Sequence, residues 1–165
     1  MQALENTLQV VVFALGDIEF GVDILQVREI ERMRPITRVP HVAAYVEGVV
    51  NLRGRLVPVV DLRVRLGLPA KVPTKATRII VAELGDRHIG MIVDQVREVA
   101  RIPVNQIDDN EGILAGLAAE YVGGLARMDN RVIILLAVQN ILSAGTVGAD
   151  TVAAGTVEGP DKQSS

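Results

Sequence analysis

The sequence repeats itself, and this repeat constrains the fold more than any other feature of the chain. Residues 15–30 (LGDIEFGVDILQVREI) align with residues 84–99 (LGDRHIGMIVDQVREV) at a constant offset of 69. Residues 45–60 (YVEGVVNLRGRLVPVV) align with residues 121–136 (YVGGLARMDNRVIILL) at an offset of 76. Two copies of one structural unit explain both matches, and the difference between the two offsets places a longer loop in the second copy.

Each copy consists of short apolar segments, rich in β-branched residues and separated by turn residues, which is typical of strands joined by tight turns. In the first copy the predicted strands cover residues 8–15, 19–23, 27–32, 46–52 and 55–60. In the second copy they cover residues 77–84, 88–92, 96–102, 122–128 and 131–136. Asp61 is a typical N-cap, so a short helix is expected at residues 62–66.

Five short strands in each copy, with few polar positions between the apolar ones, favour a small closed barrel, because closure removes exposed strand edges. We therefore predict an all-β fold in which two five-stranded barrels pack side by side. The predicted bounds are residues 8–67 for the first barrel, 68–76 for the linker, 77–136 for the second barrel and 137–143 for a short terminal helix.

Residues 144–165 have a different composition, dominated by Ala, Gly, Thr and Ser. Such a segment buries too little apolar surface to offset the entropy of ordering it. The sequence therefore predicts a disordered C-terminal tail.

The composition excludes several classes of protein. The chain has no cysteine, which rules out disulfides, thiolate catalysis and cysteine-based zinc sites. A net charge of −3, with only two Phe, two Tyr and no Trp, argues against a nucleic-acid partner. The N-terminal residues do not resemble a signal peptide, and no apolar run approaches the roughly 18–20 residues of a membrane helix. We therefore expect a soluble cytoplasmic chain that does not insert into the membrane.

No catalytic, metal-binding or cofactor-binding constellation stands out in the sequence. The only serines are Ser143, Ser164 and Ser165, at or beyond the end of the predicted fold. His41 and His88 have no companion at metal-ligand spacing, so both are interpreted as surface polar residues. We expect no cofactor and no enzymatic activity.

The turn at residues 51–54 (NLRG) includes Arg53, although a tight turn needs only residues such as glycine or asparagine. Arg53 is therefore a candidate functional residue. The second copy has Asp129 at the equivalent position, so the fold itself does not require arginine there. Regular strand alternation would place Val27 and Glu29 on one face. A carboxylate in an apolar sheet favours a cationic neighbour, and Arg53 is a plausible partner for Glu29.

The segments GVVNLRGRLVPVVDLR and ALGDIEFGVDILQVREI closely resemble the chemotaxis coupling proteins of the CheW family, and the similarity covers residues 8–142. The resemblance implies one CheW-like domain (residues 1–142) made of two SH3-like barrels, followed by the tail. It also implies a non-catalytic adaptor that joins methyl-accepting chemotaxis receptors to the histidine kinase CheA.

The resemblance also implies two binding sites. A groove between the barrels would receive the helical tip of the receptor, and its residues would be Val27, Glu29, Arg53, Val96 and Val99. The first barrel would bind the regulatory domain of CheA through Arg28, Ile30, Gly48 and Leu56. Two alternatives remain: a scaffold of a related chemosensory array that controls pili or gliding, and a small β-barrel enzyme.

Overall fold

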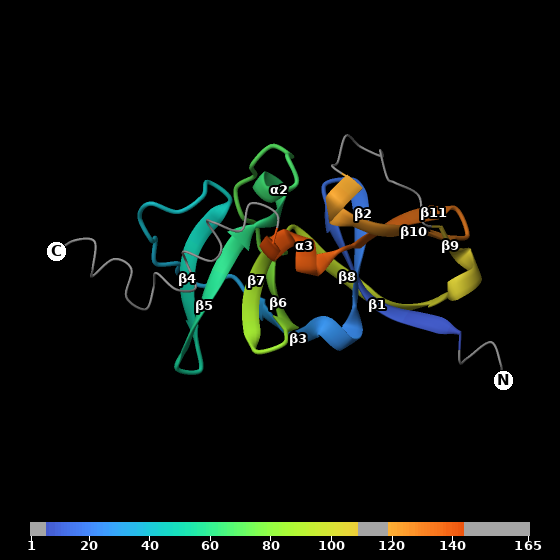
Figure 1. The fold of residues 1–165 in the computed structure, drawn as a ribbon. Coiled ribbons are helices and arrows are strands. Elements are labelled where there is room, and N and C mark those ends of the chain that lie inside the picture. The colour runs from blue at the N-terminus through green and yellow to red at the C-terminus, as the bar shows by residue number, and fades with distance from the viewer. Residues whose placement is uncertain (1–5, 109–118, 144–165) are drawn as a thin grey trace.

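The computed structural model describes residues 6–108 and 119–143, and it consists mainly of strands (Figure 1). The first half contains β1 (Thr7–Leu15), β2 (Ile18–Asp23), the 3₁₀ turn η1 (Ile24–Gln26), β3 (Val27–Arg32), β4 (Val46–Leu52), β5 (Arg55–Asp61) and α2 (Leu62–Arg65). The second half contains β6 (Arg78–Leu84), β7 (Arg87–Val93), β8 (Gln95–Pro103), η2 (Val104–Gln106), β9 (Ile107–Asp108), η4 (Ala119–Tyr121), β10 (Val122–Met128), β11 (Arg131–Leu136) and α3 (Val138–Ser143).

The predicted all-β class with a few short helices is confirmed, and the observed strand ends lie within one residue of the predicted ones. Asp61 caps α2 as expected, because its carboxylate accepts hydrogen bonds from the backbone N–H groups of Arg63 and Val64. No helix in the described part of the chain is long and apolar enough to cross a membrane. The predicted disordered tail, residues 144–165, lies outside the described residues.

The strands form two sheets. Sheet A has the strand order β8-β1-β2-β11-β10-β9, and sheet B has the order β3-β6-β7-β5-β4. Neighbouring strands are antiparallel except for one parallel pair in each sheet, β2 with β11 and β5 with β7. These two parallel pairs are equivalent in the repeat, so the two sheets are built to the same plan.

Each sheet takes strands from both copies, and this corrects the predicted barrel bounds of 8–67 and 77–136. The hairpin β1–β2 of the first copy lies in sheet A between strands of the second copy, and the hairpin β6–β7 of the second copy lies in sheet B. A repeat shows which strands are equivalent, but it does not show which copy supplies each strand of a sheet. The predicted linker, residues 68–76, therefore joins two parts of sheet B.

Most strands are buried on both faces, and successive residues alternate between two cores. In β1, Val10 and Val12 belong to a core inside sheet A, whereas Val11 and Phe13 belong to a larger core that both sheets share. The same alternation holds in β6 of sheet B, where Ile80 faces this shared core. Burial on both faces explains why the strands read as nearly continuous apolar runs rather than as alternating apolar and polar residues.

Candidate functional site

The turn between β4 and β5 presents Arg53 to solvent. Arg53 (φ 54°) and Gly54 (φ 83°) both have left-handed backbone conformations, as the two-residue turn of a tight hairpin requires. The Asn51 side chain stabilises the turn by accepting a hydrogen bond of 2.9 Å from the Gly54 backbone N–H. Asp129 occupies the equivalent position with φ 55°, so either side chain is compatible with this turn.

The Arg53 guanidinium lies against two carboxylates of β3. It forms an ion pair with Glu29, as the sequence predicts, and its Nη1 is 3.6 Å from Glu31 Oε2. These carboxylates raise the pKa of Arg53, mainly through the hydrogen bond with Glu29. Arg34 donates a 2.8 Å hydrogen bond to Glu31 and thereby lowers the pKa of that carboxyl. The side chain of Arg53 is 73% exposed although it forms these ion pairs.

A β-bulge in β3 changes the faces on which the predicted site residues lie. Val27 pairs with Ala82 and Glu29 pairs with Val81, so Arg28 is an extra residue without a partner in the adjacent strand. Cross-strand partners project to the same face, and an extra residue breaks the two-residue alternation. Val27 and Glu29 therefore lie on opposite faces of sheet B, and the prediction that they share a face is wrong.

The same bulge recurs in β8, the equivalent strand of the second copy. Val96 pairs with Phe13 and Glu98 pairs with Val12, which leaves Arg97 as the extra residue. Because of this bulge, Val96 and Val99 lie on one face of sheet A although they are three residues apart. The repeated Gln-Val-Arg-Glu segment therefore coincides with the same backbone irregularity in both copies.

Each bulge presents two apolar side chains, and we call these four the seam residues: Val27 and Ile30 in β3, and their repeat equivalents Val96 and Val99 in β8. Val27 and Val96 pack against the core that the two sheets share. Ile30 pairs with Ile80, a residue of that same core, and thus lies on the face of Val27. Ile30 is 40% exposed and Val99 is 51% exposed, so the outer members of both pairs are accessible.

The remaining predicted kinase-site residues differ in their accessibility. Leu56 is 61% exposed beside the turn, and Arg28 is exposed and 3.3 Å from Glu83. Gly48 is buried, because the backbone of Thr37 crosses it and exchanges two 2.9 Å hydrogen bonds with Val49. A side chain at Gly48 would overlap the Thr37 carbonyl, so this glycine is an architectural residue rather than a surface contact.

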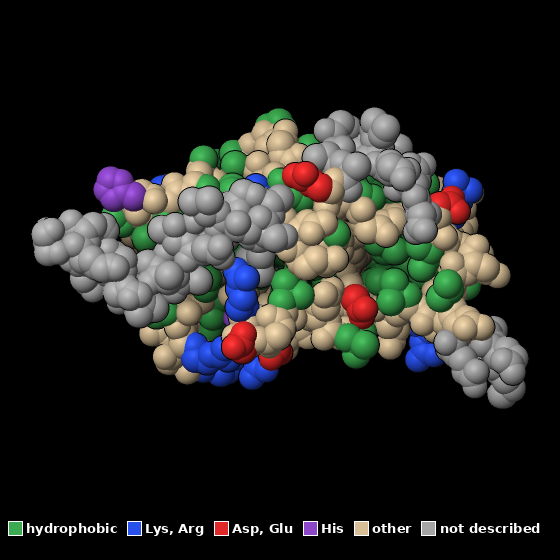
Figure 2. Space-filling model, viewed as in Figure 1, with side chains coloured by type: hydrophobic (Ala, Val, Ile, Leu, Met, Phe, Trp, Pro, Cys, Tyr) green, Lys and Arg blue, Asp and Glu red, His purple; other side chains and the backbone are tan. Residues whose placement is uncertain are grey.

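Charged side chains gather at the end of the molecule where hairpins β4–β5 and β6–β7 turn (Figure 2). Arg55 contributes to this surface, and its guanidinium contacts the ring of His88. The side chain of His88 is only 13% exposed and its Nε2 lies 3.6 Å from Glu83 Oε2. His88 is therefore largely buried beside charged neighbours, in contrast to the surface position that the sequence predicts.

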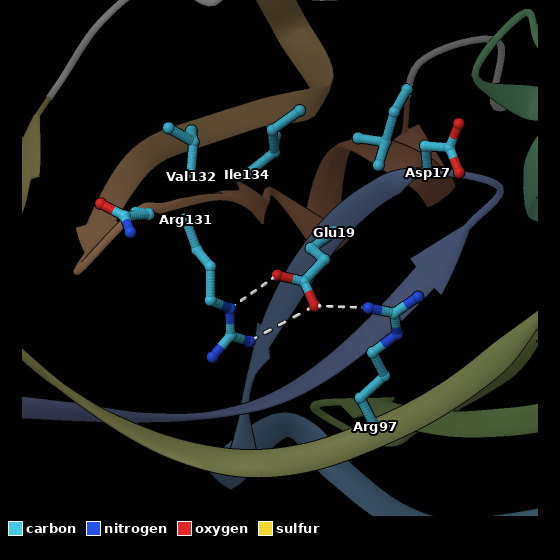
Figure 3. Close-up of a pocket in the computed structure, with 8 residues that line it drawn as sticks. Asp17, Glu19, Arg97, Arg131, Val132 and Ile134 are labelled. Atoms are coloured by element: carbon cyan, nitrogen blue, oxygen red, sulfur yellow. Dashed lines mark hydrogen bonds and ion pairs between the residues drawn. The ribbon is translucent and has the colours of Figure 1, made fainter.

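Sheet A has an equivalent charged crevice that the sequence reasoning missed (Figure 3). Glu19 accepts hydrogen bonds from Arg131 Nε at 2.9 Å and from Arg97 Nη1 at 3.0 Å, and these arginines lower its pKa. Arg131 also binds Glu98, at 2.7 Å. The crevice has a volume of about 560 Å³ and is also lined by Asp17, Ile18, Asn130, Val132 and Ile134. The repeat could have revealed it, because Arg97 and Arg131 are the equivalents of Arg28 and Arg55.

The described residues contain no cluster of His, Asp or Glu that could hold a metal ion. Their accessible surface includes the apolar seam residues and paired arginines and glutamates near strand ends. Apolar anchors with polar surroundings are typical of protein–protein contact surfaces. The fold and this surface thus define a two-sheet scaffold for protein binding.

The chain belongs to the CheW family, because the family model described as the CheW-like domain matches residues 9–145. The chain is 36% identical over 133 residues to the chemotaxis protein CheW of Klebsiella aerogenes, covering 81% of this chain and 80% of that protein. It superposes on the crystal structure of the scaffolding protein TtCheW from Thermoanaerobacter tengcongensis with a TM-score of 0.76 and 33% identity, covering 82% and 87% of the two chains.

A more distant relative carries a different name. The chain is 31% identical over 113 residues to the protein PilI of Pseudomonas aeruginosa, covering 68% of this chain and 64% of that protein. The predicted family and the predicted architecture of two SH3-like barrels are both confirmed by these comparisons. Among these relatives, the Klebsiella protein is a chemotaxis protein and TtCheW is a scaffolding protein.

Proposed function

We propose that this chain is a cytoplasmic, non-catalytic adaptor that joins the tip of a methyl-accepting chemotaxis receptor to the regulatory domain of the histidine kinase CheA. Membership of the CheW family supports the coupling role. The observation that supports our assignment of the two binding sites is that the same β-bulge occurs in β3 and in β8. This bulge presents two equivalent pairs of apolar side chains beside the shared core.

The seam residues are our proposed receptor site. An amphipathic helix binds by laying apolar side chains at i, i+3 and i+4 spacing into an apolar surface. Val27 and Val96 supply half-buried contacts, and Ile30 and Val99 supply accessible ones. This grouping moves Ile30 from the kinase site to the receptor site.

The turn region of β4–β5 is our proposed kinase site. It includes Arg53 with its partner Glu29, the exposed Leu56 and the bulge residue Arg28. Glu29 and Arg53 move to this site because the bulge separates Glu29 from the face of Val27. An exposed leucine next to a charge pair is a suitable centre for a polar-rimmed interface. Gly48 supports the site only through the backbone.

The decisive experiment compares two valines of equal exposure. Val99 of the seam and Val104 of η2 are each 51% exposed and lie five positions apart. We expect Val99→Ala to weaken binding of a receptor cytoplasmic fragment about tenfold in calorimetry, in the range of an interface anchor. Val104→Ala should leave the affinity unchanged. Equal affinities of the two variants would refute the seam as the receptor site, and no binding by the unmodified chain would refute the adaptor function.

The similarity to PilI supports a second candidate, in which the same two surfaces serve a chemosensory array that controls pili. The surfaces would be used in the same way, and only the partners would differ. Expression in two strains, one without its chemotaxis adaptor and one without its pilus-array adaptor, distinguishes the candidates. Restored swimming behaviour supports the chemotaxis role, whereas restored twitching alone supports the pilus role.

A further inference from the structure

Arg65, the last residue of α2, lies between the only two tyrosines of the chain. The carbon of its guanidinium group is 4.1 Å from the ring centroid of Tyr45 and 5.1 Å from that of Tyr121. Its Nε donates a 3.3 Å hydrogen bond to the backbone oxygen of Ile141 in α3. Arg65 thus joins α2 with the residues that precede β4 and β10 and with the last helix, and these elements belong to both sheets.

The two aromatic rings take the place of an anionic partner for Arg65. Its Nη2 atom is buried and has no hydrogen-bond partner, and no carboxylate among the described residues forms an ion pair with this guanidinium. An aromatic face attracts a cation through its quadrupole, more strongly when water is excluded. The charge of Arg65 also acts on the phenol group of Tyr121. Burial raises the pKa of this tyrosine, and the positive charge of Arg65 lowers it.

The tyrosines occupy equivalent positions in the repeat, and their backbones have equivalent bonds. The Tyr45 carbonyl accepts a 2.7 Å hydrogen bond from Asp61 N–H, and the Tyr121 carbonyl accepts a 2.9 Å bond from Ala137 N–H. Two repeat-equivalent tyrosines therefore contact one and the same guanidinium. A second guanidinium beside these rings would be repelled by the first. Accordingly, the equivalent of Arg65 in the second copy is Ile141, a fully buried apolar residue.

We propose that Arg65 is a positioning residue: by linking Tyr45 to Tyr121, it fixes sheet A relative to sheet B and so aligns the two halves of the seam. The rings, Val27 and Val96 all pack in or against the shared core, which gives a continuous route of contacts from Arg65 to the seam. The consequence for receptor affinity rests on the proposed function. The effect on the position of the sheets does not.

The absence of cysteine allows the position of the sheets to be measured directly. Leu56→Cys on β5 and Val132→Cys on β11 place one spin label on each sheet at exposed, repeat-equivalent positions. In pulsed electron paramagnetic resonance we expect a narrow distance distribution for the otherwise unmodified chain and a clearly broader or shifted one for Arg65→Met. Arg65→Lys, which keeps a cation between the rings, should restore most of the narrow distribution. Arg127→Met, which removes an exposed arginine of β10, is the matched control and should have no effect.

Tyrosine titration tests the contact itself, since Tyr45 and Tyr121 account for all tyrosine absorbance and the chain has no tryptophan. Loss of the Arg65 charge should raise the pH at which Tyr121 ionises, with circular dichroism confirming that the chain stays folded. We further expect Arg65→Met to weaken binding of the receptor fragment about fivefold, with rescue by Arg65→Lys. An unchanged distance distribution in Arg65→Met would overturn the proposal. A changed distribution with receptor affinity unaltered would support the positioning of the sheets and overturn its consequence for receptor binding. If the unmodified chain does not bind the receptor, the adaptor function fails, and the label distances alone decide the role of Arg65.

Discussion

Arg63 and Asp94 form a two-point ion pair that joins α2 to the end of β7, with Nε to Oδ1 at 2.9 Å and Nη2 to Oδ2 at 2.6 Å. The same carboxylate accepts a 2.8 Å hydrogen bond from the Gly16 backbone N–H in the β1–β2 turn. Gly16 lies in a turn between two strands of sheet A, whereas β7 belongs to sheet B and α2 packs against it. One half-buried carboxylate therefore connects the two sheets.

Asp94→Asn should lower the free energy of unfolding by about 2 kcal/mol at neutral pH, because it removes a partly buried charge pair and leaves Arg63 with a weaker partner. The hydrogen bond from Arg63 is the main reason that the pKa of Asp94 is lowered. Urea denaturation measures the loss. Asp86→Asn, at an exposed turn position, is the control and should change stability little.

The stabilisation from Asp94 should also depend on pH in a defined direction. Because its folded pKa lies below the unfolded value of about 3.9, the contribution is complete above that pH and is lost as the pH falls through it toward the folded pKa. We expect the difference in unfolding free energy between the native chain and Asp94→Asn to shrink steadily below about pH 4. A difference that stays constant into acid would contradict the ion-pair account.

Gly48→Ala should destabilise the chain by about 3 kcal/mol, because the new side chain meets the Thr37 carbonyl and the backbone has φ 147°. Gly54→Ala is a matched comparison: it also has positive φ, at 83°, but open space around it. Its cost should be about 1 kcal/mol. Thermal melts distinguish the two, and equal losses would show that the backbone conformation, rather than the crossing at Thr37, is the constraint.

Arg53→Ala should leave the melting temperature nearly unchanged, because the side chain is largely exposed and Asp129 occupies the same turn position in the second copy. The same change should weaken binding of the CheA regulatory domain roughly tenfold, as expected for a lost charge-assisted contact. A double-mutant cycle with Glu29→Gln separates folding from binding. Strong coupling in the melts with unchanged kinase affinity would make the pair structural.

Ile30→Ala and Leu56→Ala should have opposite effects on the two partners. Ile30 shares the face of Val27, so its truncation should weaken binding of the receptor fragment about fivefold and leave kinase binding intact. Leu56 lies beside the Arg53 turn, so its truncation should weaken kinase binding instead. Calorimetry with each purified partner measures both affinities. If Ile30→Ala reduced only kinase affinity, our regrouping of the site would be wrong.

The sequence alone determined ten of the strands and the equivalence of the two copies, and it indicated Arg53 as a plausible partner for Glu29. These features depend on local information: apolar runs bounded by turn residues, matching segments at fixed offsets, and a carboxylate that requires a cation. The observed strand ends are accordingly close to the predicted ones.

Only the tertiary structure decided which strands share a sheet and which faces the site residues occupy. Hairpins β1–β2 and β6–β7 have nearly the same chemistry, so no local signal shows that each joins strands of the other copy. Arg28 and Arg97 become extra bulge residues through the pairing of β3 with β6 and of β8 with β1. Register is a property of two strands together, set by how both pack into a common core, and one inserted residue reverses the face of those that follow.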